Sequence, residues 1–201
     1  MAKALNQNRM RDSWIMGGVG MLIIAVAEPV MPFGSNAHEF LEYVGYFLVA
    51  IAALGRVTAS AFLGGHKNQS LITYGPYSMM RNPLYFFSWL GFIGFGFLSG
   101  FFTLVALFGA GFFFLYDRLI KREEGRLTEI FGEAYRDYCR SVPRFWPSLK
   151  ATHVPDEVPL KPQYIVNAFK DAIWWFLPFV LFEAAEWLHV AGYFPTLVKL
   201  P

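Results

Sequence analysis

The stretch LYFFSWLGFIGFGFLSGFFTLVALFGAGFFFLY, residues 84–116, decides the fold of this chain. Its 33 residues contain no Asp, Glu, Lys or Arg. A single helix of this length would be about 50 Å long, whereas the hydrocarbon core of a bilayer is roughly 30 Å thick. Ser99 and Gly100 lie at the midpoint of the stretch and are typical of a turn. We therefore predict two short membrane helices that form a hairpin.

The composition of the whole chain also indicates a membrane protein. Of the 201 residues, 55% are hydrophobic and 16% are charged, and the mean hydropathy is +0.37. Soluble domains usually carry about a quarter charged residues, so this composition excludes a disordered chain. Because Cys139 is the only cysteine, a disulfide-stapled secreted scaffold is excluded as well. The net charge of +2 is too small to indicate a nucleic-acid partner, and we expect none.

Three further apolar stretches bring the expected number of transmembrane helices to about five. They are Trp14–Ala27, Tyr43–Leu63 and Ala172–Phe182. The second contains one charged residue, Arg56, and the third is interrupted by Pro178. We therefore predict an all-α integral membrane protein with a single domain over residues 1–201. Its N-terminal spans are expected within residues 13–63 and its C-terminal span at about residues 167–192.

The basic residues fall on one side of these predicted spans. The segment Glu28–Glu42 contains no Lys or Arg, whereas Arg81 and Arg118 flank the long apolar stretch. The positive-inside rule then places the N-terminus and both polar connectors in the cytoplasm. We expect a multi-pass protein of a prokaryotic cytoplasmic membrane. The run Ala25-Val26-Ala27 is similar to a signal-peptidase site, but we favour an uncleaved first span.

The first polar connector, residues 66–85, leads into the predicted hairpin. Gly75-Pro76 is a turn signal, and Pro83 can occupy the first turn of the following helix. Arg81 and Tyr85 would then flank the cytoplasmic mouth of the hairpin. From spacing alone, a loop with a snorkelling arginine and interfacial tyrosines is favoured.

The second polar connector begins at Asp117 and predicts an interfacial amphipathic helix. Its apolar residues recur at near-helical spacing and are Leu127, Ile130, Phe131, Tyr135 and Tyr138. A run of charges is usually a solvated face. Glu123 and Glu124 nevertheless lie within a turn of the bilayer exit, where a carboxylate can be partly desolvated and functionally useful.

Taken together, the two connectors resemble the isoprenylcysteine carboxyl methyltransferase and phospholipid methyltransferase superfamily of integral membrane enzymes. The first signature aligns without gaps on residues 69–85, with matches at Leu71, Ile72, Gly75, Tyr77, Arg81, Pro83 and Tyr85. The second aligns on residues 123–143, with matches at Glu123, Glu124, Leu127, Phe131, Gly132, Tyr135, Tyr138, Val142 and Pro143. Two histidines of the family are replaced by Gln69 and Asn82, which removes a titratable imidazole at each position.

The resemblance implies methyl transfer from S-adenosylmethionine to a lipophilic acceptor in the bilayer, with a family-like core at about residues 66–147. The acceptor, a carboxylate, amine or thiol of a prenyl- or acyl-type lipid, stays open, as does the oligomeric state. The implied catalytic residues are Arg81, Glu123 and Glu124. The implied cofactor-binding residues are Gln69, Leu71, Gly75, Pro76, Tyr77, Arg81, Asn82, Pro83, Tyr85, Glu124, Tyr135 and Tyr138. The expected partners are the lipid bilayer and the lipophilic substrate, and no obligate protein partner is evident.

Two other classes of protein remain as alternatives. A membrane reductase of the sterol-reductase kind has similar arginine and glutamate signatures and uses NADPH, but its chain is normally longer. A membrane protein without enzymatic activity can also retain this scaffold. Binding of S-adenosylhomocysteine or of NADPH would distinguish all three classes.

The polar residues at the end of the last span raise the question of a metal site. Glu183, Glu186 and His189 lie three residues apart, on one side of a predicted helix. Metal sites in helical bundles need further ligands from other helices. On the same predicted side these are Glu28, His38, Glu39 and Glu42. We favour a solvated helix end or a polar packing cluster and predict no metal site.

The glycines of the hairpin also have two interpretations. Gly91, Gly94 and Gly96 lie on or near adjacent helical turns. They can leave a groove for the chain of a lipid acceptor, or they can allow close packing of membrane helices.

Overall fold

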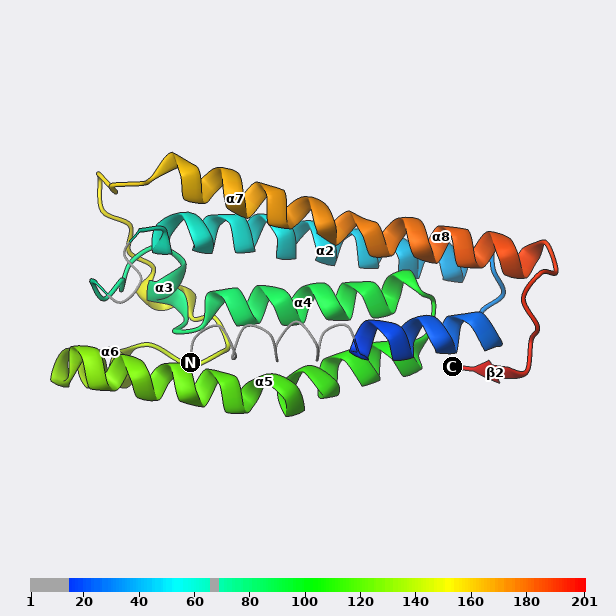
Figure 1. Cartoon of the computed structure of the whole chain (residues 1–201), viewed down its shortest axis with the longest axis horizontal. Helices are drawn as coiled ribbons and strands as arrows, with labels where there is room; N and C mark the ends of the chain where they lie inside the picture. The colour runs from blue at the N-terminus through cyan, green and yellow to red at the C-terminus, as the bar shows by residue number, and fades with distance from the viewer. Residues whose placement is uncertain (1–14, 66–68) are drawn as a thin grey trace. The chain divides into compact units, whose positions relative to one another are not determined.

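The computed structural model describes residues 15–65 and 69–201, so Trp14, the basic residues ahead of it and positions 66–68 of the first connector lie outside the described residues. Almost all elements are helical (Figure 1). The helix Ile15–Val26 is followed by α2 (Asn36–Leu63), α3 (Pro76–Met79), α4 (Pro83–Leu98), α5 (Phe102–Phe131), α6 (Glu133–Ser141), η1 (Leu149–Ala151), α7 (Pro162–Ile173), η2 (Trp174–Phe176) and α8 (Leu177–Val190).

Within the described residues, three helical segments are long and apolar enough to cross a membrane. They are Asn36–Leu63, Phe102–Phe131 and Pro162–Val190. Two shorter apolar helices, Ile15–Val26 and Pro83–Leu98, accompany them. The predicted all-α membrane fold is confirmed. The C-terminal helical segment begins at Pro162, a few residues before the expected position, because proline is well tolerated in the first turn of a helix.

The chain forms two compact units, each built from several segments. The first unit comprises the described parts of Met1–Val49, Gly91–Tyr116 and Phe176–Pro201. The second comprises Ala50–Leu90 and Asp117–Trp175. Helices α2, α4 and α5 contribute residues to both units.

The predicted hairpin turn lies in the first unit, between α4 and α5. Gly100 has a φ of 72°, a conformation that glycine adopts without steric cost. The hydroxyl of Ser99 donates to the carbonyl of Gly96 at 2.6 Å and so helps to end α4. Beyond the turn, Phe92 contacts the rings of Phe108 and Phe112 across the hairpin. The second helix is longer than predicted, since α5 continues for 30 residues.

The predicted amphipathic helix is divided between two helices. Helix α5 ends at Phe131 and α6 begins at Glu133, because Gly132 has a φ of 57°. The spacing of the apolar residues continues across this break, so periodicity alone did not reveal it. Tyr135 and Tyr138 form the buried face of α6. Helix α6 is therefore amphipathic, as predicted, but shorter.

Two strands that the sequence did not predict join distant parts of the first unit. Strand β1 (Ala27–Pro29) pairs in parallel with β2 (Val198–Leu200), in the register Ala27 to Val198. The carboxylate of Glu28 accepts from Thr196 at 2.5 Å and lies 3.8 Å from the ammonium of Lys199. Strands of three residues carry too little alternation to be recognised in a sequence.

The single charge in the second predicted span, Arg56, is fully accommodated within the second unit. Its guanidinium donates to the carbonyl of Leu84 at 3.3 Å and to the hydroxyl of Ser88. It also lies 5.2 Å from the ring centroid of Trp175. Charged groups in membrane segments are tolerated when they are paired in this way.

Two of the three hairpin glycines, Gly94 and Gly96, serve close packing. A Cβ atom on Gly94 would lie 2.8 Å from Val49 Cγ2 and 3.1 Å from the carbonyl oxygen of Gly45. A Cβ atom on Gly96 would lie 2.6 Å from the Cα of Val105. The distances to Val49 Cγ2 and to Val105 Cα are shorter than a Cβ atom tolerates, so the described residues leave no groove for a lipid chain at these two positions.

Replacing Gly94 with alanine should lower the free energy of unfolding by about 1–3 kcal/mol, because the added methyl overpacks the contact with Val49. The matched control is Gly125→Ala in α5, where, apart from its chain neighbours and the helix's own backbone, no atom of residues 15–65 and 69–201 lies within 4 Å of the new Cβ atom. That substitution should be neutral or stabilise by about 0.5–1 kcal/mol. Thermal unfolding in detergent measures both variants. Equal melting temperatures for the two variants would contradict the packing role of Gly94.

Candidate functional site

The two polar connectors are joined by backbone hydrogen bonds within the second unit. The amide of Arg81 donates to the carbonyl of Pro143 at 2.9 Å, and the amide of Ser148 donates to Met79 at 2.9 Å. The amide of Gly75 donates to the carbonyl of His153 at 2.7 Å. The segment after α6 therefore holds the first connector at Gly75, Met79 and Arg81.

A single short helix, α3, orients the first connector. Gly75 caps it with a φ of 61°, and Pro76 occupies its first turn. The hydroxyl of Ser78 donates to the carbonyl of Gly75 at 2.7 Å. The ring of Phe62 fills the space that a Cβ atom on Gly75 would need. Gly75 is thus required by the turn and by close packing.

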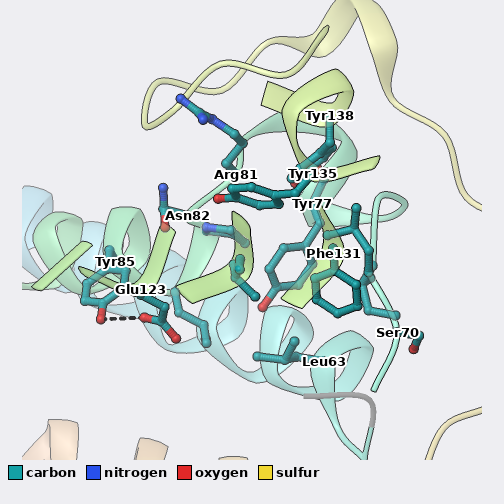
Figure 2. A pocket seen from close by; sticks show the side chains of 15 residues that line it. Leu63, Ser70, Tyr77, Arg81, Asn82, Tyr85, Glu123, Phe131, Tyr135 and Tyr138 are labelled. Carbon is teal, nitrogen blue, oxygen red and sulfur yellow. Dashed lines mark hydrogen bonds between the residues drawn. The ribbon is translucent and has the colours of Figure 1, made fainter. Parts of the chain in front are cut away.

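Residues of both connectors line one pocket (Figure 2). The pocket encloses about 670 Å³ of space free of protein atoms, part of it open to solvent. It is lined by Leu63, Ser70, Leu71, Ile72, Tyr77, Arg81, Asn82, Pro83, Leu84, Tyr85, Glu123, Leu127, Phe131, Tyr135 and Tyr138. Apolar and aromatic side chains predominate, and a few polar groups are placed among them, as is usual for small-molecule sites.

A carboxylate network borders this pocket and is centred on Glu124. Its Oε1 accepts from Asn82 Nδ2 at 3.0 Å, and its Oε2 accepts from Arg144 Nε at 2.9 Å. Arg81 Nη1 lies 3.6 Å from the same carboxylate. Asn82 Nδ2 also donates to the carbonyl of Arg144 at 3.0 Å. An amide nitrogen carries two N–H donors, whereas an imidazole nitrogen carries at most one, so asparagine suits this position better than the histidine of the family.

Arg144 connects this network to the end of the apolar stretch. Its Nη1 donates to Asp117 Oδ1 at 2.8 Å. Burial lowers the pKa of Arg144, but its hydrogen bonds to Asp117 and Glu124 outweigh that effect and raise the pKa above the ordinary value. The guanidinium therefore stays charged and orients Glu124.

Two guanidinium groups retain buried N–H donors without a hydrogen-bond partner in the described part of the chain. Arg81 Nη1 contacts the sulfur of Cys139, but Arg81 Nε is buried and has no hydrogen-bond partner among the described residues. Arg144 Nη2 is likewise buried and has no hydrogen-bond partner among these residues. A buried donor without a partner costs free energy, and a carboxylate or phosphate of a ligand would satisfy it.

A second carboxylate lies in the pocket itself. Tyr85 donates its hydroxyl to Glu123 Oε2 at 2.9 Å, which Figure 2 marks with a dashed line. Unlike Glu124, Glu123 lines the pocket directly. It can therefore accept hydrogen bonds from the ammonium or hydroxyl groups of a ligand.

Three tyrosines form the buried wall of the pocket. Tyr138 donates its hydroxyl to the carbonyl of Tyr77 at 2.6 Å, and Tyr77 donates to the carbonyl of Ala59 at 3.3 Å. Burial raises the pKa of Tyr77, Tyr135 and Tyr138 above the ordinary value. These phenols therefore stay neutral at physiological pH and act as hydrogen-bond donors with apolar faces.

The raised pKa values of these tyrosines predict a loss of stability in alkali. The folded state favours the neutral phenols. Their contribution to the free energy of unfolding is therefore complete below about pH 10, the pKa of tyrosine in the unfolded chain, and it falls as the pH rises further. Melting temperatures measured between about pH 8 and pH 11 should drop towards the upper end of that range. The drop should be smaller in Tyr138→Phe than in the wild type. In the control Tyr193→Phe, at a residue that is 71% exposed, the drop should equal that of the wild type. An identical drop in all three proteins would contradict this account.

The structure brings most of the sequence-predicted site residues together. The predicted residues that line the pocket are Leu71, Tyr77, Arg81, Asn82, Pro83, Tyr85, Glu123, Tyr135 and Tyr138. Glu124 borders the pocket through Asn82. Gln69 is exposed, and neither it nor Gly75 nor Pro76 lines the pocket.

Sequence reasoning missed the contribution of Arg144 and Asp117. Neither residue was assigned a role in the site from the sequence. The position of Arg144 directly after the Val142-Pro143 end of the second signature was the available signal. The chain must turn back there for the arginine to reach Glu124, and no local pattern predicts that turn.

Comparison with known proteins gives three relatives and one family. The phospholipid methyltransferase family model matches residues 41–134. The chain is 31% identical over 158 residues to the nickel-cobalt-cadmium resistance protein NccN of Alcaligenes xylosoxydans xylosoxydans, which covers 79% of this chain and 74% of the relative. It is 29% identical over 167 residues to the cobalt-zinc-cadmium resistance protein CzcN of Cupriavidus metallidurans. That match covers 83% of this chain and 77% of the relative.

A shorter match connects the chain to a eukaryotic enzyme. It is 34% identical over 80 residues to the protein-S-isoprenylcysteine O-methyltransferase of Schizosaccharomyces pombe, which covers 39% of this chain and 33% of the relative. No solved structure matches the chain.

The family match and the shorter match to a methyltransferase indicate a protein of the membrane methyltransferase class in general, and the all-α membrane fold agrees with it. Within that class, the chain belongs to the phospholipid methyltransferase family. The resemblance predicted from the two connectors is confirmed.

Proposed function

We propose that this protein transfers a methyl group from S-adenosylmethionine to a lipophilic acceptor held in the membrane. The observation that carries the proposal is the pocket itself. Both connectors line it, and at its border Arg81 Nε is buried and has no hydrogen-bond partner among the described residues. When bound, the cofactor supplies an electrophilic methyl group on a sulfonium cation.

The side chains of the pocket match the chemistry of this cofactor. The free N–H of Arg81 suits its carboxylate, and Glu123 suits its ammonium or ribose hydroxyl groups. The faces of Tyr77 and Phe131 suit the adenine and the sulfonium, because aromatic rings attract cations. Since the tyrosines stay neutral, they add no competing charge.

The Glu124 network acts on the pocket by positioning. Glu124 accepts from Asn82 and Arg144 at once, so it holds two segments of the chain in a single geometry. Displacement at a methyl group depends mainly on alignment of the reacting atoms and exclusion of water. Arg81 and Glu123 orient the ligands, and the Glu124 network fixes Arg81 and Asn82.

The acceptor we propose is a lipid with a carboxylate, amine or thiol nucleophile. Leu63, Leu71, Leu84 and Leu127 give the pocket an apolar part that suits a prenyl or acyl chain. Among the residues that line the pocket, Glu123 supplies the carboxylate, so it is the group that would accept a proton from the nucleophile. A base is needed only when the nucleophile arrives protonated.

Two measurements test this proposal. Calorimetric titration of the purified protein should show binding of S-adenosylhomocysteine and none of NADPH. Incubation with labelled S-adenosylmethionine and a membrane lipid extract should then give a lipid whose mass has increased by one methylene group. Binding of NADPH alone would instead assign the protein to the reductase class.

The names of the two bacterial relatives support a second inference about the physiological setting. Both names refer to metal resistance. We infer that methylation of the membrane lipid contributes to growth in the presence of nickel, cobalt, zinc or cadmium. A deletion strain should regain tolerance when it expresses the wild-type protein but not Glu124→Ala. Equal tolerance of the deletion and wild-type strains would contradict this inference.

The proposed topology has the N-terminus and both connectors in the cytoplasm. It follows from the excess of Lys and Arg in the connectors over the segment Glu28–Glu42. Labelling of cysteines introduced singly at Gln69 and at Glu39 should distinguish the two sides. A membrane-impermeant reagent should label the Glu39→Cys variant in intact cells and the Gln69→Cys variant only after lysis. The reverse pattern would invert the topology.

A further inference from the structure

A second group of polar side chains lies in the first unit and takes no part in the pocket. His38 and Glu42 are one turn apart in the first half of α2, and Glu186 comes from α8. His38 Nε2 lies 3.6 Å from Glu42 Oε1 and 3.4 Å from Glu186 Oε2. The three ligand atoms all lie within 4.8 Å of one another.

The imidazole of His38 is buried and lacks a hydrogen-bond partner. The residue is 1% exposed, and neither ring nitrogen makes a hydrogen bond within residues 15–65 and 69–201. Nδ1 is directed to the turn at Gly100, and the ring edge contacts Phe33. Nε2 is therefore the nitrogen directed to the two carboxylates. A buried polar atom without a partner costs free energy, and a ligand that bonds to this atom removes that cost.

The two distances measured from His38 Nε2 fit a small cation. In zinc sites the bonds to nitrogen and oxygen are about 2.0–2.2 Å long, so neighbouring ligand atoms of a tetrahedron lie roughly 3.4 Å apart. The distances of 3.4 and 3.6 Å from His38 Nε2 agree with that spacing. Both contacts lie within ion-pair range, but neither has the geometry of a hydrogen bond.

The charges of the cluster also balance with a divalent cation. Two carboxylates and a neutral imidazole carry a charge of −2, which one divalent cation neutralises. Within the described part of the chain, His38 is the ion-pair partner of both Glu42 and Glu186. The two carboxylates are 18% and 25% exposed, so the cluster has an open side through which a cation and a water ligand can enter.

The next helical turn holds the two helices in register. Tyr46, one turn after Glu42, donates its hydroxyl to Glu183 Oε1 at 3.0 Å. Glu183 lies about one turn before Glu186. His189, by contrast, is directed to the carbonyl of Ile24 at 2.5 Å and lies outside the cluster. The cluster is thus held in place by its supporting contacts, and its ligands differ from the Glu183, Glu186 and His189 set that the sequence suggested.

We propose that His38, Glu42 and Glu186 bind a divalent first-row transition metal ion of the Zn²⁺ or Co²⁺ type. One imidazole nitrogen and two carboxylate oxygens form a ligand set of borderline hardness, which suits these ions better than Mg²⁺ or Ca²⁺. Three protein ligands leave one position for water. This site is independent of the proposed methyl transfer.

The test uses the full chain in detergent, stripped of metal with a chelator and titrated with Co²⁺ as a spectroscopic probe. We expect one equivalent per chain, visible absorption bands typical of tetrahedral Co²⁺, and competition by Zn²⁺. Loss of a residue that merely supports a ligand costs about 10- to 100-fold in metal affinity, so loss of a ligand should cost at least about 100-fold. Glu186→Gln and His38→Ala should both show this loss.

Glu39→Gln is the matched control, because Glu39 is an exposed carboxylate of the same helical turn. It should bind Co²⁺ as the wild type does. Glu186→Gln keeps the shape of the side chain, so the test holds even when His38→Ala does not fold. Absence of stoichiometric binding in the wild type, or wild-type affinity in Glu186→Gln, would overturn the proposal and leave a histidine–carboxylate ion-pair cluster. Binding of S-adenosylhomocysteine, measured on the same samples, reports separately on the methyl-transfer site.

Discussion

Replacing Arg81 with alanine should lower the turnover of methyl transfer by about 30- to 1000-fold and leave the protein folded in detergent. That range corresponds to about 2–4 kcal/mol of lost stabilisation, the usual effect of removing one positioned charged donor. Arg81 lines the pocket, and its Nε has no hydrogen-bond partner in the described part of the chain. The substitution therefore removes the ligand contact proposed for Arg81 and leaves the backbone hydrogen bond to Pro143 intact.

Rates should be measured with labelled S-adenosylmethionine, and folding by thermal unfolding of the same preparation. The matched control is Arg136→Ala, because Arg136 is 59% exposed and pairs with Glu133 on the outer face of α6. Burial explains the contrast: an exposed ion pair contributes about 0–1 kcal/mol, and Arg136 touches no ligand. If Arg81→Ala retained the rate of Arg136→Ala, the assignment of Arg81 to the site would be wrong.

Replacing Glu124 with alanine should reduce turnover by a similar factor and should also destabilise the protein. Glu124 accepts hydrogen bonds from Asn82 and Arg144, and it faces Arg81. Without it, two guanidinium groups lose their shared counter-charge. We expect the free energy of unfolding to fall by about 1–3 kcal/mol, less than for a fully buried pair because Arg144 is 34% exposed.

A double-mutant cycle distinguishes a network from separate contacts. Because Arg144 acts through Glu124, Arg144→Ala should cost little further activity in the Glu124→Ala background, although it is harmful by itself. Glu133→Ala, at a carboxylate that is 60% exposed, is the control. Additive losses in the double variant would mean that Arg144 contributes to the pocket without Glu124.

Much of the candidate site could be predicted because its residues lie in two short ordered signatures. Arg81, Tyr85 and Glu123 were placed in the site from these patterns, and all three line the pocket. Gln69 was placed there by the same alignment, but it is exposed and outside the pocket. An alignment transfers positions along the chain, whereas the direction of a side chain depends on the local backbone.

The difference is clearest for the two adjacent glutamates. Glu123 and Glu124 are equivalent in the sequence, but one lines the pocket and the other holds Asn82 and Arg144. Consecutive residues of a helix point about 100° apart, so they cannot share one role. Which of them faces the pocket depends on the rotation of α5 about its axis, and packing sets that rotation.

The sequence by itself determined the membrane class, the all-α fold and the hairpin at Ser99-Gly100. These are local properties, because hydropathy, helix length and turn propensity act over a few turns of chain. Only the tertiary structure decided which distant residues meet: Arg144 with Glu124, Gly94 with Val49, and His38 with Glu186. Such pairs depend on how helices are rotated and shifted along one another. Many packings bury the same apolar faces, so the hydrophobic pattern alone does not select among them.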